Sequence, residues 1–328
     1  MRRRDFIKVI AGSACAWPRA LRAQPAGRIP KIGVLWHAGS AEEEGPYLRA
    51  LLDGFKGLGY VEGRNITFEH RFPNEMPERF KSMAAELVTL NVQVLVSVGS
   101  VAPSYAKNAT TTVPVVFMLV ADPVGTHLVE SLSRPGGNVT GLSSFSIDLI
   151  GKRLQILKEM IPQLSRVAQL VNPNAQASSL YIEVTRTAAA ELGLAVQTFQ
   201  ARSLDELEPA FDAMARAGMQ AVTVNQDGLA FQGRAIIARL ALARHLPLCA
   251  YSREIFDAGA LLSYGADHAA ICRRGAIYVD KILKGAKPSE LPVEGPTRFE
   301  FLINLQMAKA LGLTVPLALI ARANEVIQ

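Results

Sequence analysis

Polar side chains follow directly after many of the apolar runs in this 328-residue chain. A carboxylate can pair with an ammonium group, hydroxyls and helix N–H groups can hold a carboxylate, and tyrosine can stack on a flat ring. The residues that fit these roles form the candidate ligand-binding set: His37, Ser40, Ser100, Val101, Asp122, Ser143, Ser144, Asn172, Asp227, Tyr251 and Tyr264. Most of them would also serve as helix N-caps or turn residues when taken alone, so their shared placement is what favours a ligand.

The motifs that usually accompany catalysis are missing from the sequence. There is no Gly-x-x-x-x-Gly-Lys-Ser/Thr, no Gly-x-Gly-x-x-Gly after the first apolar run and no Gly-x-Ser-x-Gly. The five histidines are scattered, and none has a partner at the spacing of metal ligands. We therefore expect no catalytic residue, no metal and no cofactor. An exported hydrolase or isomerase with Asp122 or Asp227 as its base is a competing hypothesis, but the sequence offers no nucleophile for it.

The elements that would position these residues alternate regularly along the chain. Strands are predicted at residues 31–36, 65–71, 92–98, 113–119, 167–171, 195–199, 221–224, 247–250, 260–265 and 299–302. Helices are predicted at residues 48–55, 77–90, 102–108, 124–132, 149–160, 179–192, 204–217, 234–245, 269–283 and 305–311. Nearly continuous apolar strands alternating with helices indicate parallel sheets that are covered on both faces. In such sheets ligands bind outside the carboxyl ends of the strands, where the candidate residues lie.

The strand–helix pattern starts again after residues 141–146, which predicts two lobes. The expected fold is α/β, with two doubly wound parallel-sheet lobes joined by short hinge crossovers. We assign residues 29–142 plus 262–288 to the first lobe and 143–261 plus 289–328 to the second. The crossovers are expected near 141–146, 251–262 and 289–298, with Gly141, Gly259 and Gly295 as hinge candidates.

Residues 1–23 have the order of an export signal. Three arginines at positions 2–4 precede a short apolar stretch, and small residues end it at Ala23. This pattern predicts twin-arginine export to the periplasm with cleavage near Ala23, whereas a basic cytoplasmic N-terminus is the alternative. The apolar stretch is too short for a permanent membrane anchor.

Removing this segment changes the charge of the protein. It takes six basic residues and one acidic residue from totals of 35 and 29, so the net charge falls from +6 to +1. A nearly neutral chain lacks the excess positive charge that nucleic-acid-binding proteins carry. No later apolar run is long enough to span a membrane. Only Cys249 and Cys272 remain, which we interpret as two buried thiols, with one disulfide as the alternative.

Six segments together resemble one family of transport proteins. They are 31–35 (KIGVL), 57–65 (GLGYVEGRN), 121–125 (ADPVG), 134–141 (RPGGNVTG), 281–288 (KILKGAKP) and 308–316 (AKALGLTVP). The chain is similar to the substrate-binding proteins of ABC transporters, in the group whose members bind tryptophan or tyrosine. The resemblance implies a type I periplasmic-binding fold and delivery of a small organic solute to ABC permease subunits in the membrane.

Three expectations about the solute and the partners accompany the resemblance. An amino acid or an aromatic carboxylate is favoured, because Tyr251, Tyr264 and Trp36 would offer flat surfaces at the rim, although Trp36 could equally be a core residue. The protein is expected to act as a monomer without nucleic acid or stable membrane insertion. A periplasmic ligand sensor that docks to a membrane receptor is the alternative function.

Overall fold

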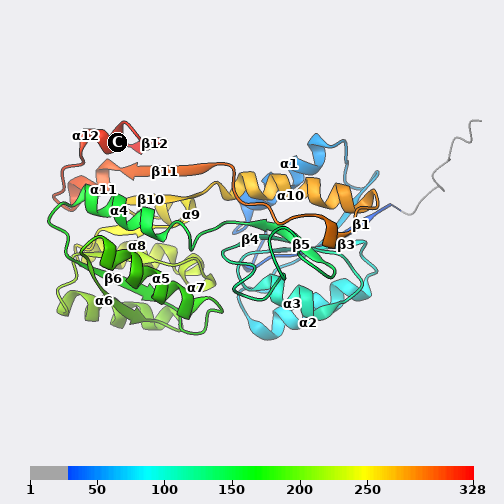
Figure 1. Ribbon diagram of the computed structural model, residues 1–328, viewed down its shortest axis with the longest axis horizontal. Helices are drawn as coiled ribbons and strands as arrows, with labels where there is room; N and C mark the ends of the chain where they lie inside the picture. The colour runs from blue at the N-terminus through cyan, green and yellow to red at the C-terminus, as the bar shows by residue number, and fades with distance from the viewer. Residues whose placement is uncertain (1–28) are drawn as a thin grey trace, which may run out of the picture.

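The computed structural model describes residues 29–328, which form two α/β lobes side by side (Figure 1). The export-signal prediction for 1–23 lies outside the described residues. The first lobe holds a fully parallel sheet in the order β2-β1-β3-β4-β5. Its strands are β1 (Lys31–Leu35), β2 (Thr67–Arg71), β3 (Val94–Val98), β4 (Val115–Val120) and β5 (Val139–Ser143). Its helices are α1 (Gly45–Gly57), α2 (Pro77–Thr89), α3 (Ala102–Ala109) and α10 (His268–Leu283).

The second lobe holds a seven-stranded sheet in the order β12-β11-β10-β9-β8-β6-β7. Its strands are β6 (Arg166–Val171), β7 (Ala195–Gln200), β8 (Ala221–Val224), β9 (Leu248–Ala250), β10 (Leu262–Ala266), β11 (Phe299–Asn304) and β12 (Glu325–Ile327). Its helices are α4 (Ile150–Met160), α5 (Ser178–Glu191), α6 (Leu207–Arg216), α7 (Gly228–Gln232), α8 (Arg234–Ala243), α9 (Arg253–Asp257), α11 (Leu305–Ala310) and α12 (Leu317–Ile320). All neighbouring pairs are parallel except β10 and β11, which run antiparallel.

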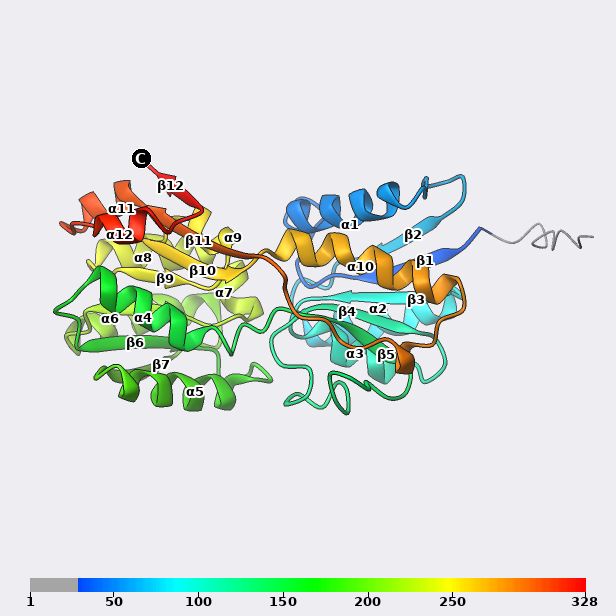
Figure 2. The ribbon, with the colours of Figure 1, turned by 45° about the horizontal axis from the view of Figure 1, so that its top comes forward.

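Helices cover both faces of each sheet, as the continuous apolar strands predict. Strands β3 and β4 are buried at every residue, because α1 and α10 pack on one face of the first sheet and α2 and α3 on the other (Figure 2). The fold prediction of two doubly wound α/β lobes is therefore confirmed. Each sheet presents the carboxyl ends of its parallel strands to the opposite lobe.

Two details of the first lobe and its boundary differ from the expectations. β10 pairs with β9 and β11 in the second sheet, so residues 262–266 do not belong to the first lobe, whereas α10 does. Residues 124–132 form turns instead of a helix, because the Asp122 carboxylate takes the N–H groups of Val124 and Gly125 and His127 adopts a left-handed conformation.

The crossovers between the lobes lie at residues 143–149, 266–268 and 294–299. Gly259 follows α9 within the second lobe, so it is not at a crossover. Gly141 has φ +158° inside β5, and a Cβ there would overlap the main chain of Phe117. Gly295 lies in the third crossover, where a Cβ would overlap the Phe145 ring. Gly141 therefore permits the close approach of β5 to β4 within the first sheet, and Gly295 permits close packing at the third crossover.

The two lobes touch each other across the cleft. The Gln176 side chain of the second lobe bonds to two first-lobe groups, the Ser104 hydroxyl at 3.0 Å and the Thr126 carbonyl at 3.2 Å. The Gln232 amide donates to Asn74 Oδ1 at 2.9 Å. These contacts hold the two lobes together across the cleft.

Two further predictions about the chain can be compared with the described residues. Cys249 and Cys272 are free, buried thiols in the cores of different lobes, as the interpretation as two buried cysteines requires. Between residues 29 and 328, no helix has the length and apolar character needed to cross a bilayer.

Candidate functional site

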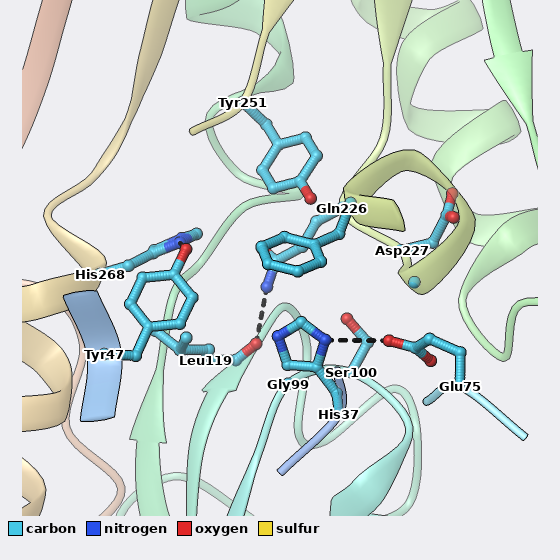
Figure 3. A pocket seen from close by; sticks show the side chains of 12 residues that line it. His37, Tyr47, Glu75, Gly99, Ser100, Leu119, Gln226, Asp227, Tyr251 and His268 are labelled. Atoms are coloured by element: carbon cyan, nitrogen blue, oxygen red, sulfur yellow. Dashed lines mark hydrogen bonds and ion pairs between the residues drawn. The ribbon is translucent and has the colours of Figure 1, made fainter. Parts of the chain in front are cut away.

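A small chamber lies between the two lobes, and we call it chamber A (Figure 3). With the lobes in contact, its free volume is about 30 Å³. The lining side chains come from both lobes: His37, Tyr47, Glu75, Gly99, Ser100, Leu119, Gln226, Asp227, Gly228, Phe231, Tyr251 and His268. In Figure 3 the residues after β1 and β3 face those after β8 and β9, so strand ends of both sheets converge on one space.

A buried histidine with two carboxylates forms the charged floor of chamber A. His37 Nδ1 lies 2.9 Å from Glu75 Oε1, and His37 Nε2 lies 3.6 Å from Glu44 Oε1. Burial alone would lower the pKa of His37, but the charges of Glu44 and Glu75 outweigh it and raise the pKa from 6.5 to about 9. His37 is therefore protonated at neutral pH and shared between the two acids.

Glu44 is fixed by the backbone of the same loop. It is 0 % exposed, and its Oε1 accepts the main-chain N–H groups of His37 at 3.1 Å and Ala38 at 2.9 Å. These bonds hold the loop after β1 in the shape that turns the His37 ring into the chamber. Glu44 is thus a positioning residue behind the wall.

Aromatic rings form the other walls of chamber A. Phe231 meets the His37 ring edge-on across the cleft, with centroids 4.6 Å apart. The Tyr47 hydroxyl and His268 Nδ1 share a hydrogen bond of 3.1 Å. The centroids of the Tyr251 and His268 rings are 6.4 Å apart. Burial lowers the pKa of His268, so this histidine is neutral and contributes a flat surface instead of a charge. A planar ligand group fits such walls.

Gln226 and Asp227, at the carboxyl end of β8, stand where the lobes meet. The Gln226 side chain donates to the Leu119 carbonyl at 2.7 Å and accepts from the Ser144 hydroxyl at 2.9 Å, so it joins the second lobe to the first. Asp227 caps α7 by accepting from Ala230 N at 2.9 Å. Burial raises the pKa of Asp227 from 3.8 to about 7, so a cation beside it would favour its ionised form.

A second chamber, with a free volume of about 20 Å³, adjoins the first, and we call it chamber B. Ser100, Gln226 and Asp227 line both chambers and form their common wall. The remaining lining residues are Val101, Val120, Ala121, Asp122, Thr126, Ala175, Gln176, Ala177 and Tyr181. Each lobe contributes half of the wall, so chamber B is also enclosed only when the lobes meet.

Six of the eleven candidate residues lie on these chambers. His37 and Tyr251 line chamber A, Val101 and Asp122 line chamber B, and Ser100 and Asp227 line both. They come together because each follows a strand whose carboxyl end faces the cleft. Asp122 turns its carboxylate onto its own loop, as described above, so it is not free to bind an amine.

The other five candidates lie elsewhere. The Ser143 hydroxyl donates to the Val120 carbonyl at 2.8 Å, and Ser144 bonds to Gln226, so both hold the first crossover. Ser40 accepts from Glu43 N and Asn172 from Asn174 N, which are ordinary turn bonds within their loops. Neither of these two residues lines chamber A or B.

Trp36 lies in the core of the first lobe, and the half-buried Tyr264 packs against the core of the second. β10 continues to Ala266, so Tyr264 is in the middle of the strand, where it packs against Phe299 and Phe301 of β11. Trp36 is 0 % exposed and its indole N–H donates to His70 Nδ1 at 3.0 Å. Neither ring offers a surface at the rim of the cleft.

Eight lining residues of chamber A are absent from the candidate set: Tyr47, Glu75, Gly99, Leu119, Gln226, Gly228, Phe231 and His268. Among them, Glu75 and His268 carried a usable signal. Glu75 lies in the loop after β2, and His268 follows the end of β10, so the strand-end rule applied to correct strand boundaries would have found both. Tyr47 and Phe231 lie within helices and reach the cleft only through lobe packing.

A comparison with protein-family models matches residues 45–327 to "ABC transporter substrate binding protein". Among characterised relatives, a tyrosine-binding protein of Clostridioides difficile is 26 % identical over 269 residues, which is 81 % of this chain and 75 % of that protein. The family match spans both lobes and every residue that lines the two chambers except His37.

Solved structures share the fold. An ABC domain from Streptococcus pneumoniae in complex with L-Trp superposes with a TM-score of 0.85 at 24 % identity, covering 92 % of this chain and 100 % of that one. A ligand-free, open substrate-binding protein from Clostridium difficile gives 0.69 at 22 % identity, covering 92 % and 99 %. The two-lobed α/β architecture is that of type I periplasmic binding proteins. Because the family model matches almost the entire described chain, this protein belongs to the ABC transporter substrate-binding protein family.

Proposed function

We propose that this protein is the extracytoplasmic solute-binding subunit of an ABC importer and that its solute is an aromatic amino acid. The observation that carries the proposal is chamber A, an enclosed space between two lobes with aromatic walls and ionisable groups at strand ends. The relative named as tyrosine-binding and the relative solved with L-Trp support the same solute class.

The charges around chamber A favour a solute with an amine over one that carries only a carboxylate. Glu75 and Asp227 line it, and the protonated His37 is already shared between Glu75 and Glu44. No lysine or arginine lines the chamber within the described chain. A solute ammonium would therefore meet uncompensated negative charge, which favours binding. This argument ranks an amino acid above an aromatic carboxylate.

The mechanism follows from the enclosure of the site by two lobes. The solute would enter an open form, contact both strand-end rims and shift the population toward the closed form. A membrane permease could then distinguish loaded from empty protein by shape. We further propose that the chain is exported to the periplasm, cleaved near Ala23 and active there as a monomer.

A thermal-shift titration of the purified protein tests the solute class. A compound that binds only the folded state raises Tm with RT ln(1 + [L]/Kd), which is about 2.7 kcal/mol of added stability at one hundred times Kd. We expect a saturable rise with L-tryptophan or L-tyrosine, with the compound recovered unchanged. Sugars and nucleosides serve as negative controls, and a rise with these alone would contradict the proposal.

A transport assay separates the importer from a ligand sensor. Deleting the gene should abolish uptake of the radiolabelled solute, and the wild-type gene should restore it. Unchanged uptake in the deletion strain, with a solute that binds the purified protein, would favour the sensor instead.

A further inference from the structure

A hydrogen-bonded pair of buried rings stands in the wall of chamber A (Figure 3). Tyr47 lies in α1, and His268 is the first residue of α10, directly after the second crossover. The Tyr47 hydroxyl and His268 Nδ1 lie 3.1 Å apart, and the two residues are 3 % and 7 % exposed. Within residues 29–328, the other ring nitrogen, His268 Nε2, has no hydrogen-bond partner. The pair thus has hydrogen-bonding capacity that the described residues do not use.

A carboxylate of the second lobe stands behind this pair. Glu254 of α9 places its Oε2 atom 4.0 Å from His268 Nδ1, and this oxygen is buried without a hydrogen-bond partner. Glu254 lines a neighbouring pocket with a free volume of about 160 Å³, and His268 is the wall between that pocket and chamber A. Burial raises the pKa of Tyr47 most, and the charge of Glu254 raises it next. The Tyr47 hydroxyl therefore lies in the field of this carboxylate.

The carboxylate determines which atoms of the pair carry hydrogen. A hydroxyl hydrogen rotates freely, so the Tyr47 hydrogen turns toward Glu254, and the Tyr47 oxygen accepts the His268 Nδ1–H. Burial lowers the pKa of His268, so its ring is neutral and holds one proton only. With that proton on Nδ1, Nε2 keeps its lone pair. The pair then has two free acceptors, the Nε2 lone pair and the second lone pair of the Tyr47 oxygen.

We propose that Tyr47 and His268 accept a hydrogen bond from an N–H or O–H group on the ring of the solute, so that the protein selects aromatic amino acids that carry a ring donor. This selection rests on the proposed function, because it concerns the same chamber and the same solute class. Indole and phenol rings satisfy the acceptors, whereas a phenyl ring would leave them buried and unpaired. Unpaired buried acceptors are costly, so the phenyl solute is disfavoured.

The other polar groups of chamber A leave this role to the ring. Its two acids, Glu75 and Asp227, stand on the opposite side of the chamber from Tyr47 and His268 in Figure 3. An ammonium group held by these acids directs the ring of the same solute toward the Tyr47–His268 pair. The pair thus reads the far end of the solute, and the acids read its amine.

The test compares solutes that differ in the ring donor. Isothermal titration would measure L-tryptophan against its benzothienyl analogue, in which a sulfur atom replaces the indole N–H, and L-tyrosine against L-phenylalanine. We expect each donor solute that binds to do so at least tenfold more tightly than its counterpart. Equal affinities within a pair would overturn the donor site while leaving the proposed aromatic solute in place. Binding of none of the four compounds would overturn the proposed function and this selection together.

His268→Phe keeps a flat ring and removes both nitrogens. We expect its L-tryptophan affinity to fall at least tenfold, whereas affinity for the benzothienyl analogue should change less than threefold. His245→Phe is the control, because His245 is exposed and lines neither chamber. An equal loss for both compounds in a variant that keeps its Tm would assign His268 to another part of the solute, such as the ammonium group, and would overturn the proposal.

Glu254→Gln tests the positioning from behind the wall. The new amide can donate to the Tyr47 oxygen, so the Tyr47 hydrogen turns to His268 Nδ1 and the ring proton moves to Nε2. Nitrogen NMR should find Nε2 of His268 unprotonated in the wild type and protonated in Glu254→Gln, whose preference for L-tryptophan over the benzothienyl analogue should be at least fivefold smaller. Glu191→Gln, which changes an exposed acid of α5, is the control. A protonated Nε2 in the wild type would overturn the assignment.

Discussion

The Glu75 carboxylate of the first lobe lies directly over Gly228, the first residue of α7 in the second lobe. A Cβ at position 228 would overlap all three atoms of the carboxyl group. The contact exists only when the lobes are together, so a side chain at residue 228 would displace Glu75 in the closed form and would disturb neither lobe alone.

Gly228→Ala should therefore weaken solute binding without unfolding the protein. The added methyl must displace Glu75 or keep the lobes apart, and we expect the Kd for L-tryptophan to rise at least tenfold. Small-angle scattering with saturating ligand should show a larger radius of gyration than for the wild type. Gly57→Ala is the control, because a Cβ at residue 57 meets nothing within 4 Å. Wild-type affinity in Gly228→Ala would contradict this account of closure.

His37 makes the stability of the protein depend on pH. Its pKa is raised from 6.5 to about 9 in the folded state, so its contribution is full below about pH 6.5 and is lost as pH rises through 9. The difference corresponds to roughly 3 kcal/mol. Urea unfolding from pH 6 to 9.5 should show this loss in the wild type and not in His37→Asn. The exposed His245→Asn is the control, and an unchanged profile in His37→Asn would refute the assignment.

Asp227 should make binding of an amine depend on pH near neutrality. Its pKa of about 7 reflects burial first and the nearby Glu75 charge second, opposed by the N–H groups of Ala230 and Leu229. Below pH 7 the carboxyl group is protonated and loses its attraction for an ammonium group. We expect L-tryptophan affinity to fall by up to about tenfold for each pH unit below 7. Titrations at pH 5.5 to 8 would measure this.

Asp227→Asn should bind more weakly at pH 8 and lose most of that pH dependence. Asp205→Asn changes an exposed acid far from the chambers and controls for net charge. A pH profile that persists in Asp227→Asn would contradict the assignment of this dependence to Asp227.

Alanine variants of Tyr264 and Phe231 should affect different properties, the first the stability of the protein and the second its affinity for the solute. Tyr264→Ala removes packing against Phe299 and Phe301, and we expect a loss of roughly 2 kcal/mol in the free energy of unfolding with unchanged Kd. Phe231→Ala removes a wall of chamber A and should weaken L-tryptophan binding about tenfold or more. Chemical unfolding and calorimetry on both variants measure the two effects. Weaker binding in Tyr264→Ala alone would reverse the assignment of these rings.

The alternation of apolar runs was sufficient to predict the architecture. Parallel strands buried on both faces are nearly continuous in apolar residues, so β3 and β4 could be recognised from residues 94–98 and 115–120 alone. The strand-end rule then placed His37, Ser100 and Asp227 on one cleft. The rule did not find Glu75, because the candidate set contains no residue from the loop after β2. It placed Tyr264 at the end of its strand, whereas β10 continues to Ala266, two residues beyond Tyr264.

By itself, the sequence determined the two-lobed α/β fold, the family resemblance and the polar rims, since these depend on local periodicity and on residues adjacent in the chain. Only the tertiary structure decided that Glu75 covers Gly228, that Phe231 faces His37 and that Tyr181 is buried without a partner. These relationships join residues far apart in the chain and arise from how the lobes pack. No local pattern shows which strand-end side chains form hydrogen bonds within their own loops and which face the cleft.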